Sequence, residues 1–284
     1  YEIPEGDKNF KGRAIQNMLN IEPDDSVNAL LRLRGLNDEE FVKSHYVVFA
    51  TKNGTVKKTS LEAYSRPRTN GVNAINIVEG DEVVDVRLTN GKNEIILANR
   101  NGRAVRFDED SIRTMGRVST GVRGMKLDDG DDQVVGMIVV NNAETETVMV
   151  VSENGYGKRS QVEDYRKTNR GGKGVKTFSI TEKTGRLVAI KNVTDDNDLM
   201  IINKSGIAIR LAVPECRVMG RATQGVRLIN LSKKNDVIAS VCKVMSTEKE
   251  AEVSGDKDDE NATPATDVQA TEAPQTETQT TETE

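Results

Sequence analysis

Residues 148–165 read VMVVSENGYGKRSQVEDY: an apolar run, an Asn-Gly pair, a second strand-like run and a polar corner. The same plan returns as VVFATKNGTVKKTSLEAY at 47–64, IILANRNGRAVRFDEDSI at 95–112 and LMIINKSGIAIRLAVPEC at 199–216. The turn glycines are Gly54, Gly102, Gly155 and Gly206, spaced 48, 53 and 51 residues apart. Asn-Gly or Ser-Gly between apolar runs is a strong hairpin signal, because both central residues of a two-residue turn need positive φ. The pattern predicts four copies of one hairpin.

A second glycine follows each hairpin and precedes valine in every copy: Gly71, Gly121, Gly174 and Gly225. Further strand-like runs come after it, such as VNAINIVEGDEVVDVRL at 72–88. One module is therefore predicted as two hairpins over about 50 residues. A module of this kind buries its apolar face only against neighbouring modules, which indicates a β-propeller or a relative of it.

The predicted fold class is all-β, a propeller-like pinwheel of four-stranded blades at about 45–92, 93–145, 146–196 and 197–245. Residues 1–44 fit the remainder of a further blade, with Gly12 in the place of the second glycine. We expect the front half of that blade to lie upstream of Tyr1. The sequence holds no run of 18 apolar residues and no secretory leader, so the expected location is the cytoplasm.

The net charge of −5 averages two unlike regions. Residues 246–284 hold 12 acids and 2 bases with no aromatic residue, a net charge of −10. Of the 40 bases and 45 acids in the whole chain, 38 bases and 33 acids remain in residues 1–245, a net charge of +5. We predict a disordered acidic tail after a basic folded region, and basic folded regions often bind polyanions.

Little in the sequence suggests catalysis. His45 is the only histidine, and Cys216 and Cys242 are too few for a four-ligand zinc site, so we predict no catalytic residue, no metal and no cofactor in this chain. An enzyme with its site at the propeller centre and a propeller that binds other proteins are the two rival hypotheses from other functional classes.

Cations recur at fixed places in the modules. The fourth residue after each turn glycine is basic, and strand alternation would put these residues on one face of every blade. A cation at the same offset in each module would form a band that can follow duplex DNA, which carries one charge per about 1.7 Å of its axis. With only 4% aromatic residues and no recognition motif, the band favours sequence-tolerant duplex binding over single-strand stacking. The candidate DNA-binding residues are Lys57, Lys58, Arg66, Arg68, Arg106, Arg113, Arg117, Arg123, Lys158, Arg159, Arg170, Lys173, Lys176, Arg210, Arg217, Arg221 and Arg227.

The most basic corner, TNRGGKG at 168–174, does not fit a nucleotide site. A P-loop would need glycine where Lys167 stands and Ser or Thr where Gly174 stands. The run from Gly155, GYGKRS, lacks the third glycine of the dinucleotide pattern and precedes a strand. We therefore interpret the corner as a strap for a DNA backbone.

The modules resemble the C-terminal domains of DNA gyrase A subunits, through NGYGKRSQVEDY, GTVKKTSLEAYSRPRTNGV and IRTMGRVSTGVRGMKLDDGD. The resemblance covers residues 1 to about 245 and implies a six-bladed pinwheel that wraps DNA around its rim. It implies a role in ATP-dependent negative supercoiling, with the gyrase B subunit and another copy of the A subunit as partners and ATP and Mg used by other parts. It also implies a bacterial, nucleoid-associated protein.

The family's box QRRGGKG belongs to a blade upstream of this chain. TNRGGKG resembles a copy of it in which Thr168 and Asn169 replace Gln and Arg. The family's nucleophilic tyrosine follows an arginine, and no tyrosine here with a visible predecessor does. The paralogous protein of topoisomerase IV, whose blades are fewer and more degenerate, is the alternative within the family.

Overall fold

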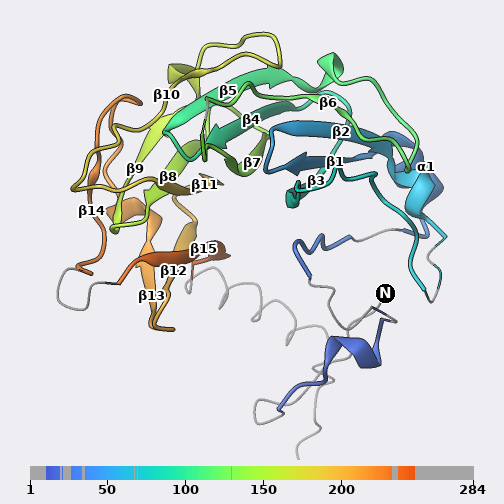
Figure 1. The fold of residues 1–284 in the computed structure, drawn as a ribbon, viewed down its shortest axis with the longest axis horizontal. Helices are drawn as coiled ribbons and strands as arrows, with labels where there is room; N and C mark the ends of the chain where they lie inside the picture. Colours follow the sequence, from blue (N-terminus) through green and yellow to red (C-terminus); the bar gives the residue numbers. More distant parts are fainter. Residues whose placement is uncertain are drawn as a thin grey trace, which may run out of the picture. The chain divides into compact units, whose positions relative to one another are not determined.

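Four antiparallel sheets, one for each copy of the hairpin, make up the fold (Figure 1). The computed structural model describes residues 11–19, 21, 27–33, 36–66, 68, 70–128, 130–231 and 236–246. The predicted tail therefore lies outside the described residues from 247 onward, as do parts of the first 44 residues. The fold is an all-β, propeller-like arrangement, as the repeat predicts.

Each sheet is called a blade and is written from its inner to its outer strand. Blade 1 holds β3 (Val83–Thr89), β1 (Tyr46–Thr51), β2 (Thr55–Ser60) and β6 (Val122–Arg123). Blade 2 holds β7 (Val134–Val140), β4 (Glu94–Asn99), β5 (Arg103–Asp108) and β10 (Val175–Lys176). Blade 3 holds β11 (Leu187–Val193), β8 (Thr147–Ser152), β9 (Tyr156–Gln161) and β14 (Val226–Arg227). Blade 4 holds β15 (Ile238–Met245), β12 (Asn197–Asn203) and β13 (Ala208–Ala212).

The outer strand of a blade comes from the next copy along the sequence. β6 lies after the second glycine of the second copy, yet it pairs with β2 of blade 1, with Val56 opposite Val122. β10 pairs with β5 and β14 pairs with β9 in the same way. The expectation that one module forms one sheet is therefore wrong, because neighbouring copies exchange a two-residue strand at the rim.

Three of the four second glycines, Gly121, Gly174 and Gly225, lie where this exchanged strand crosses the preceding blade, whereas a Cβ at Gly71 would meet no atom within 4 Å. Gly174 has φ +73°, and a Cβ there would lie 2.2 Å from the carbonyl oxygen of Ala104. A Cβ at Gly225 would lie 2.5 Å from the carbonyl oxygen of Gly157. The close approach of two backbones thus explains the glycine at these three positions.

The hairpin turns are one residue longer than predicted. The Gly155 amide donates to the Ser152 carbonyl at 3.1 Å, so glycine is the fourth residue of the turn and Asn154 the third. The other three copies close in the same way, at 3.0–3.1 Å. This is the three-residue hairpin loop, in which a turn is followed by a glycine of positive φ. All eight predicted glycines have positive φ, from 70° to 113°.

The hydrophobic core lies between neighbouring blades. In β4, Ile95 and Leu97 pack with residues of blade 1, whereas Ile96 and Ala98 pack with residues of blade 3. Alternate residues of a strand point to opposite faces, and both faces are covered here, so the four central residues from Ile95 to Ala98 are all apolar. Inner strands of successive blades also contact each other, β3 with β7, β7 with β11 and β11 with β15.

The described part of residues 1–44 contains no strand. It has the 3₁₀ turn η1 (Ile15–Asn17) and the six-residue helix α1 (Glu39–Ser44) that precedes β1. The side chain of Asp38 caps α1 by accepting hydrogen bonds from the amides of Glu40 and Phe41. This helix was not predicted from the sequence, although Asp38 followed by two glutamates is a start signal.

Candidate nucleic-acid interface

The four cations at the fourth position after each turn glycine are not a free surface band. Lys58 and Arg159 are buried, and the side chain of Arg106 is only 10% exposed. Arg210 is more exposed, and its guanidinium binds Asp198 at 2.7 Å and the Met245 carbonyl at 2.6 Å. The prediction of an exposed band is therefore wrong for Lys58, Arg106 and Arg159. Arg210 is exposed but is already bound within its own blade.

These buried cations bind the corner of the next copy, a 3₁₀ turn after its second strand. The corners are η3 (Glu109–Ser111), η4 (Val162–Asp164) and η5 (Val213–Glu215). Lys58 donates to the Glu109 carbonyl at 3.3 Å, and Arg159 donates to the Cys216 carbonyl at 2.7 Å. Lys58, Arg106 and Arg159 thus tie three blades to the next copy. Both a tie between blades and a phosphate contact would place a cation at the same position in successive copies, so recurrence alone could not distinguish the two roles.

Arg106 shows the tie most fully. Its guanidinium donates to the Val162 carbonyl at 2.8 Å and to the Tyr165 carbonyl at 3.0 Å, both in or beside η4. Its Nε also donates to Glu94 at 2.6 Å. Burial alone would raise the pKa of Glu94, but hydrogen bonds from Lys167 and Arg106 hold it below its ordinary value.

Lys57 and Lys158, the buried lysine pair, occupy the third position after the turn glycine in blades 1 and 3 and are 0% exposed. Lys57 donates to the carbonyls of Ala74 and Arg117, and Lys158 donates to the Gly220 carbonyl at 2.6 Å. Burial lowers the pKa of each ammonium to about 8. Both lysines were predicted DNA contacts, and their burial leaves them holding the corners instead.

The remaining candidates lie on the corners and outer strands. Arg123, Lys176 and Arg227 are exposed on β6, β10 and β14. On the corners, Arg66, Arg68, Arg113, Lys173 and Arg217 are exposed, and Arg117, Arg170 and Arg221 are partly buried.

Two corner arginines join cations of successive copies. Arg170 donates to the carbonyls of Ser111 and Arg123, both at 2.9 Å. Arg221 donates to the Lys176 carbonyl at 2.7 Å. These bonds hold the corner of one copy against the outer strand of the copy before it, so that exposed cations of both lie at one seam.

Backbone bonds complete the first of these seams. The Gly171 amide donates to the Gly124 carbonyl at 2.6 Å, and the Lys126 amide donates to the Gly172 carbonyl at 3.0 Å. Lys126 is exposed and was not among the predicted contacts, because it lies five residues past the second glycine, beyond the offsets at which cations recur. The seam thus includes an exposed cation that does not occupy one of the positions at which cations recur in the modules.

Lys173, the lysine of the predicted strap, is exposed but already has a carboxylate partner. Its ammonium lies 2.8 Å from Asp128, and this hydrogen bond holds the pKa of that carboxyl below its ordinary value. A phosphate would have to displace Asp128 to bind Lys173. An exposed pair of this kind is worth about 0–1 kcal/mol, so displacement costs little.

Among the described residues, no group of three His, Cys, Asp or Glu side chains could hold a metal ion. In the same part of the chain, no helix is long and apolar enough to cross a membrane. The described surface does present exposed cations on corners that hydrogen bonds hold to the neighbouring copy.

Comparison with known proteins agrees with the repeat. A family model described as the DNA gyrase C-terminal domain, beta-propeller, matches residues 45–90, 93–141, 146–194 and 197–242. The DNA gyrase A subunits of Staphylococcus epidermidis and of Staphylococcus aureus are each 43% identical over 244 residues, 86% of this chain. The chain spans only 27% of the length of those relatives.

Two solved structures share the fold. The C-terminal domain of DNA topoisomerase IV superimposes with a TM-score of 0.77 at 26% identity, covering 88% of this chain and 76% of that one. The DNA gyrase A C-terminal domain superimposes with a TM-score of 0.73 at 24% identity, covering 83% of this chain and 76% of that one.

Proposed function

The chain belongs to the DNA gyrase C-terminal domain family, and from this premise we propose that its blades bind duplex DNA of any sequence and wrap it along the outer strands. The observation that carries the proposal is the pair of seams, where arginines hold exposed cations of successive copies together. A rigid row of cations that repeats from blade to blade favours a long, regularly charged ligand over a compact one.

The phosphate contacts assigned to this surface are Arg123, Lys126, Lys176 and Arg227 with the exposed corner cations, and Lys173 after it releases Asp128. Contacts of this kind position a duplex without reading its sequence. The buried ties and the buried lysine pair are left out of the DNA-binding set, because a side chain without accessible surface cannot neutralise a phosphate.

In the whole protein, we propose, the chain is the wrapping part of the gyrase A subunit, within a type II topoisomerase that couples ATP hydrolysis to negative supercoiling. Strand cleavage would then belong to upstream parts and to the other copy of the A subunit, and ATP and Mg to the gyrase B subunit, in a bacterial cytoplasm. Topoisomerase IV is the alternative that the solved C-terminal domain favours, and the 43% identical relatives, which are gyrase A subunits, favour gyrase.

The direct test measures affinity for two unrelated duplexes of equal length across a salt series. With about six to ten phosphates neutralised, the slope of log K against log salt should be about −5 to −9 on both. A flat response to salt, or a strong preference for one sequence, refutes the proposal. A protein-binding scaffold, the rival function, predicts the flat response.

A further inference from the structure

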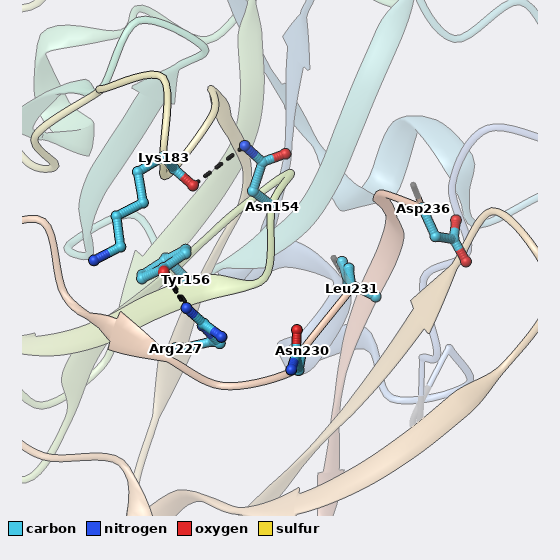
Figure 2. A pocket seen from close by; sticks show the side chains of 7 residues that line it. All are labelled: Asn154, Tyr156, Lys183, Arg227, Asn230, Leu231 and Asp236. Atoms are coloured by element: carbon cyan, nitrogen blue, oxygen red, sulfur yellow. Dashed lines mark hydrogen bonds between the residues drawn. The ribbon is translucent and has the colours of Figure 1, made fainter. Parts of the chain in front are cut away.

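A cavity of about 300 Å³ opens at blade 3 beside the outer strand β14. Figure 2 shows the lining side chains, which include Tyr156 from β9, Arg227 from β14 and Lys183 from the loop that precedes β11. Tyr156 and Arg227 are register partners on adjacent strands. The cavity therefore lies directly beside one of the exposed outer-strand cations.

Two cations converge on one tyrosine in this cavity. Arg227 donates to the Tyr156 hydroxyl through Nε at 3.2 Å and through Nη2 at 3.1 Å. The Lys183 ammonium lies 5.5 Å from the centre of the same ring, and the Arg227 guanidinium lies 5.6 Å from it. The tyrosine thus orients the arginine and attracts both positive charges through its ring.

The loop that carries Lys183 is held in place. The side-chain amide of Asn154 donates to the carbonyls of Glu182 and Lys183, at 3.2 and 3.3 Å. Asp236, at the other end of the lining, accepts from the Ser205 hydroxyl at 2.6 Å and from the Val237 amide at 2.8 Å. Within the described part of the chain, no carboxylate forms an ion pair with Lys183 or Arg227.

The same place in blade 2 is neutralised. There Arg103 stands where blade 3 has Tyr156, with Lys176 as its register partner. The loop that precedes β7 supplies Asp128, which lies 3.9 Å from Arg103 and 2.8 Å from Lys173. In blade 3 the equivalent loop supplies Lys183 to the cavity, and the neighbouring Glu182 forms no ion pair with Lys183 or Arg227. Blade 3 therefore has an aromatic ring and a second cation at this place, and no described carboxylate is paired with either cation.

We propose that Tyr156, Lys183 and Arg227 form a phosphate-binding pocket on blade 3, in which the two cations hold one phosphate group and the tyrosine hydroxyl orients Arg227. A phosphate fits because both cations line the same cavity and neither forms an ion pair within the described part of the chain. This inference rests on the proposed function, under which the ligand is a backbone phosphate of the bound duplex. The same pocket chemistry would also accept a free phosphate.

The test compares the whole chain with Lys183→Gln, Arg227→Gln and the double variant. Lys92→Gln is the control for Lys183→Gln, because Lys92 is an exposed lysine outside the proposed DNA surface and each of these two variants removes one positive charge. We expect the double variant to bind duplex DNA about tenfold more weakly. Its salt slope should be shallower by about one. The control should match the wild type in both quantities.

Tyr156→Phe separates orientation from charge. It keeps the ring and both cations but removes the hydroxyl that accepts from Arg227, so DNA affinity should fall less than in the double variant while the salt slope changes little. A second arm titrates inorganic phosphate and follows the Arg227 Nε–H and Lys183 resonances by NMR in the wild type and in Tyr156→Phe.

Three results decide the proposal. Weaker DNA binding by the double variant assigns the pocket to a backbone phosphate. Unchanged DNA binding with saturable phosphate shifts that Tyr156→Phe weakens assigns it to a free phosphate. Unchanged DNA binding with no phosphate shift overturns the pocket. If the wild type binds no DNA at all, the proposed function fails, and the phosphate titration still decides the pocket.

Discussion

Replacing Arg106 by methionine separates a tie between blades from a DNA contact. Methionine keeps much of the aliphatic volume but removes every hydrogen bond to Glu94, Val162 and Tyr165. If the buried cations hold adjacent blades together, Arg106→Met should weaken the fold. If they bind phosphate, as their recurrence first suggested, it should weaken DNA binding and leave the fold unchanged.

The expected magnitude follows from the contacts. Removing one partner of a largely buried ion pair costs about 3–5 kcal/mol. The two carbonyls that lose their donor cost about 1–3 kcal/mol each if water cannot reach them, and these costs overlap with the first. We take about 3–5 kcal/mol in total. For a folded unit of this size, about 2–4 °C per kcal/mol gives a fall in Tm of about 6–20 °C.

The assay measures thermal unfolding and DNA affinity of the same preparations, with Arg123→Met as the control. Arg123 is exposed on an outer strand, so its replacement should weaken DNA binding and leave Tm nearly unchanged.

The effect of Arg106→Met should also depend on pH. Because the folded pKa of Glu94 is lowered, the stability from the Arg106–Glu94 ion pair is present above the ordinary pKa of 4.5 and lost as pH falls through the folded value. The gap in Tm between Arg106→Met and wild type should therefore narrow in acid. An unchanged Tm with weakened DNA binding would refute the tie.

Four further outcomes are expected. Lys173→Ala should weaken DNA binding with little change in Tm, whereas Arg170→Ala should lower both, since Arg170 also bonds two carbonyls; a Tm loss confined to Lys173→Ala would contradict this. Gly155→Val should destabilise the fold, because φ is +79° and a Cβ would lie 2.7 Å from the Ile229 carbonyl oxygen; a normal melting curve would contradict the turn. Deleting residues 247–284, which are strongly acidic, should tighten DNA binding at low salt, and equal affinities there would leave the tail without a regulatory role. Finally, between pH 8 and 10 the buried lysine pair is mostly neutral in the folded protein and mostly protonated in the unfolded chain. Because the unfolded state then binds more protons, wild-type stability should rise across that window, and replacing both lysines by methionine should flatten the rise.

The repeat and its glycines could be predicted because both are local properties. An Asn-Gly or Ser-Gly turn between apolar runs is a strong short-range signal for a hairpin, and four copies at one period need one another to bury their faces. The exchange of strands could not be predicted. The two-residue strand at Val122 has no periodicity of its own, and only the position of the preceding blade decides its partner.

The role of the recurring cations was harder to predict from the sequence. Strand alternation indicates the face on which a side chain lies, but it does not indicate what packs against that face. Lys58, Arg106 and Arg159 bind carbonyls of the next copy, on a face that the alternation pattern alone could not distinguish from one in solvent. A signal was present. Glu94 and Asp198 each stand 12 residues before the arginine that they bind, and Tyr46 stands 12 residues before Lys58, whose ammonium lies 5.0 Å from its ring. A partner at constant spacing marks a cation that is already satisfied.

Wrapping is the central claim, and DNA topology tests it most directly. The chain is bound at increasing ratios to nicked circular plasmid, the nick is sealed with ligase, the protein is removed, and the linking number of each product is read from its gel mobility. If the duplex follows the seams around successive blades, the mean linking number should shift steadily with the amount of bound protein, and Arg123→Met should reduce the shift. An unchanged linking number on plasmid that a parallel gel shift shows to be saturated would contradict wrapping.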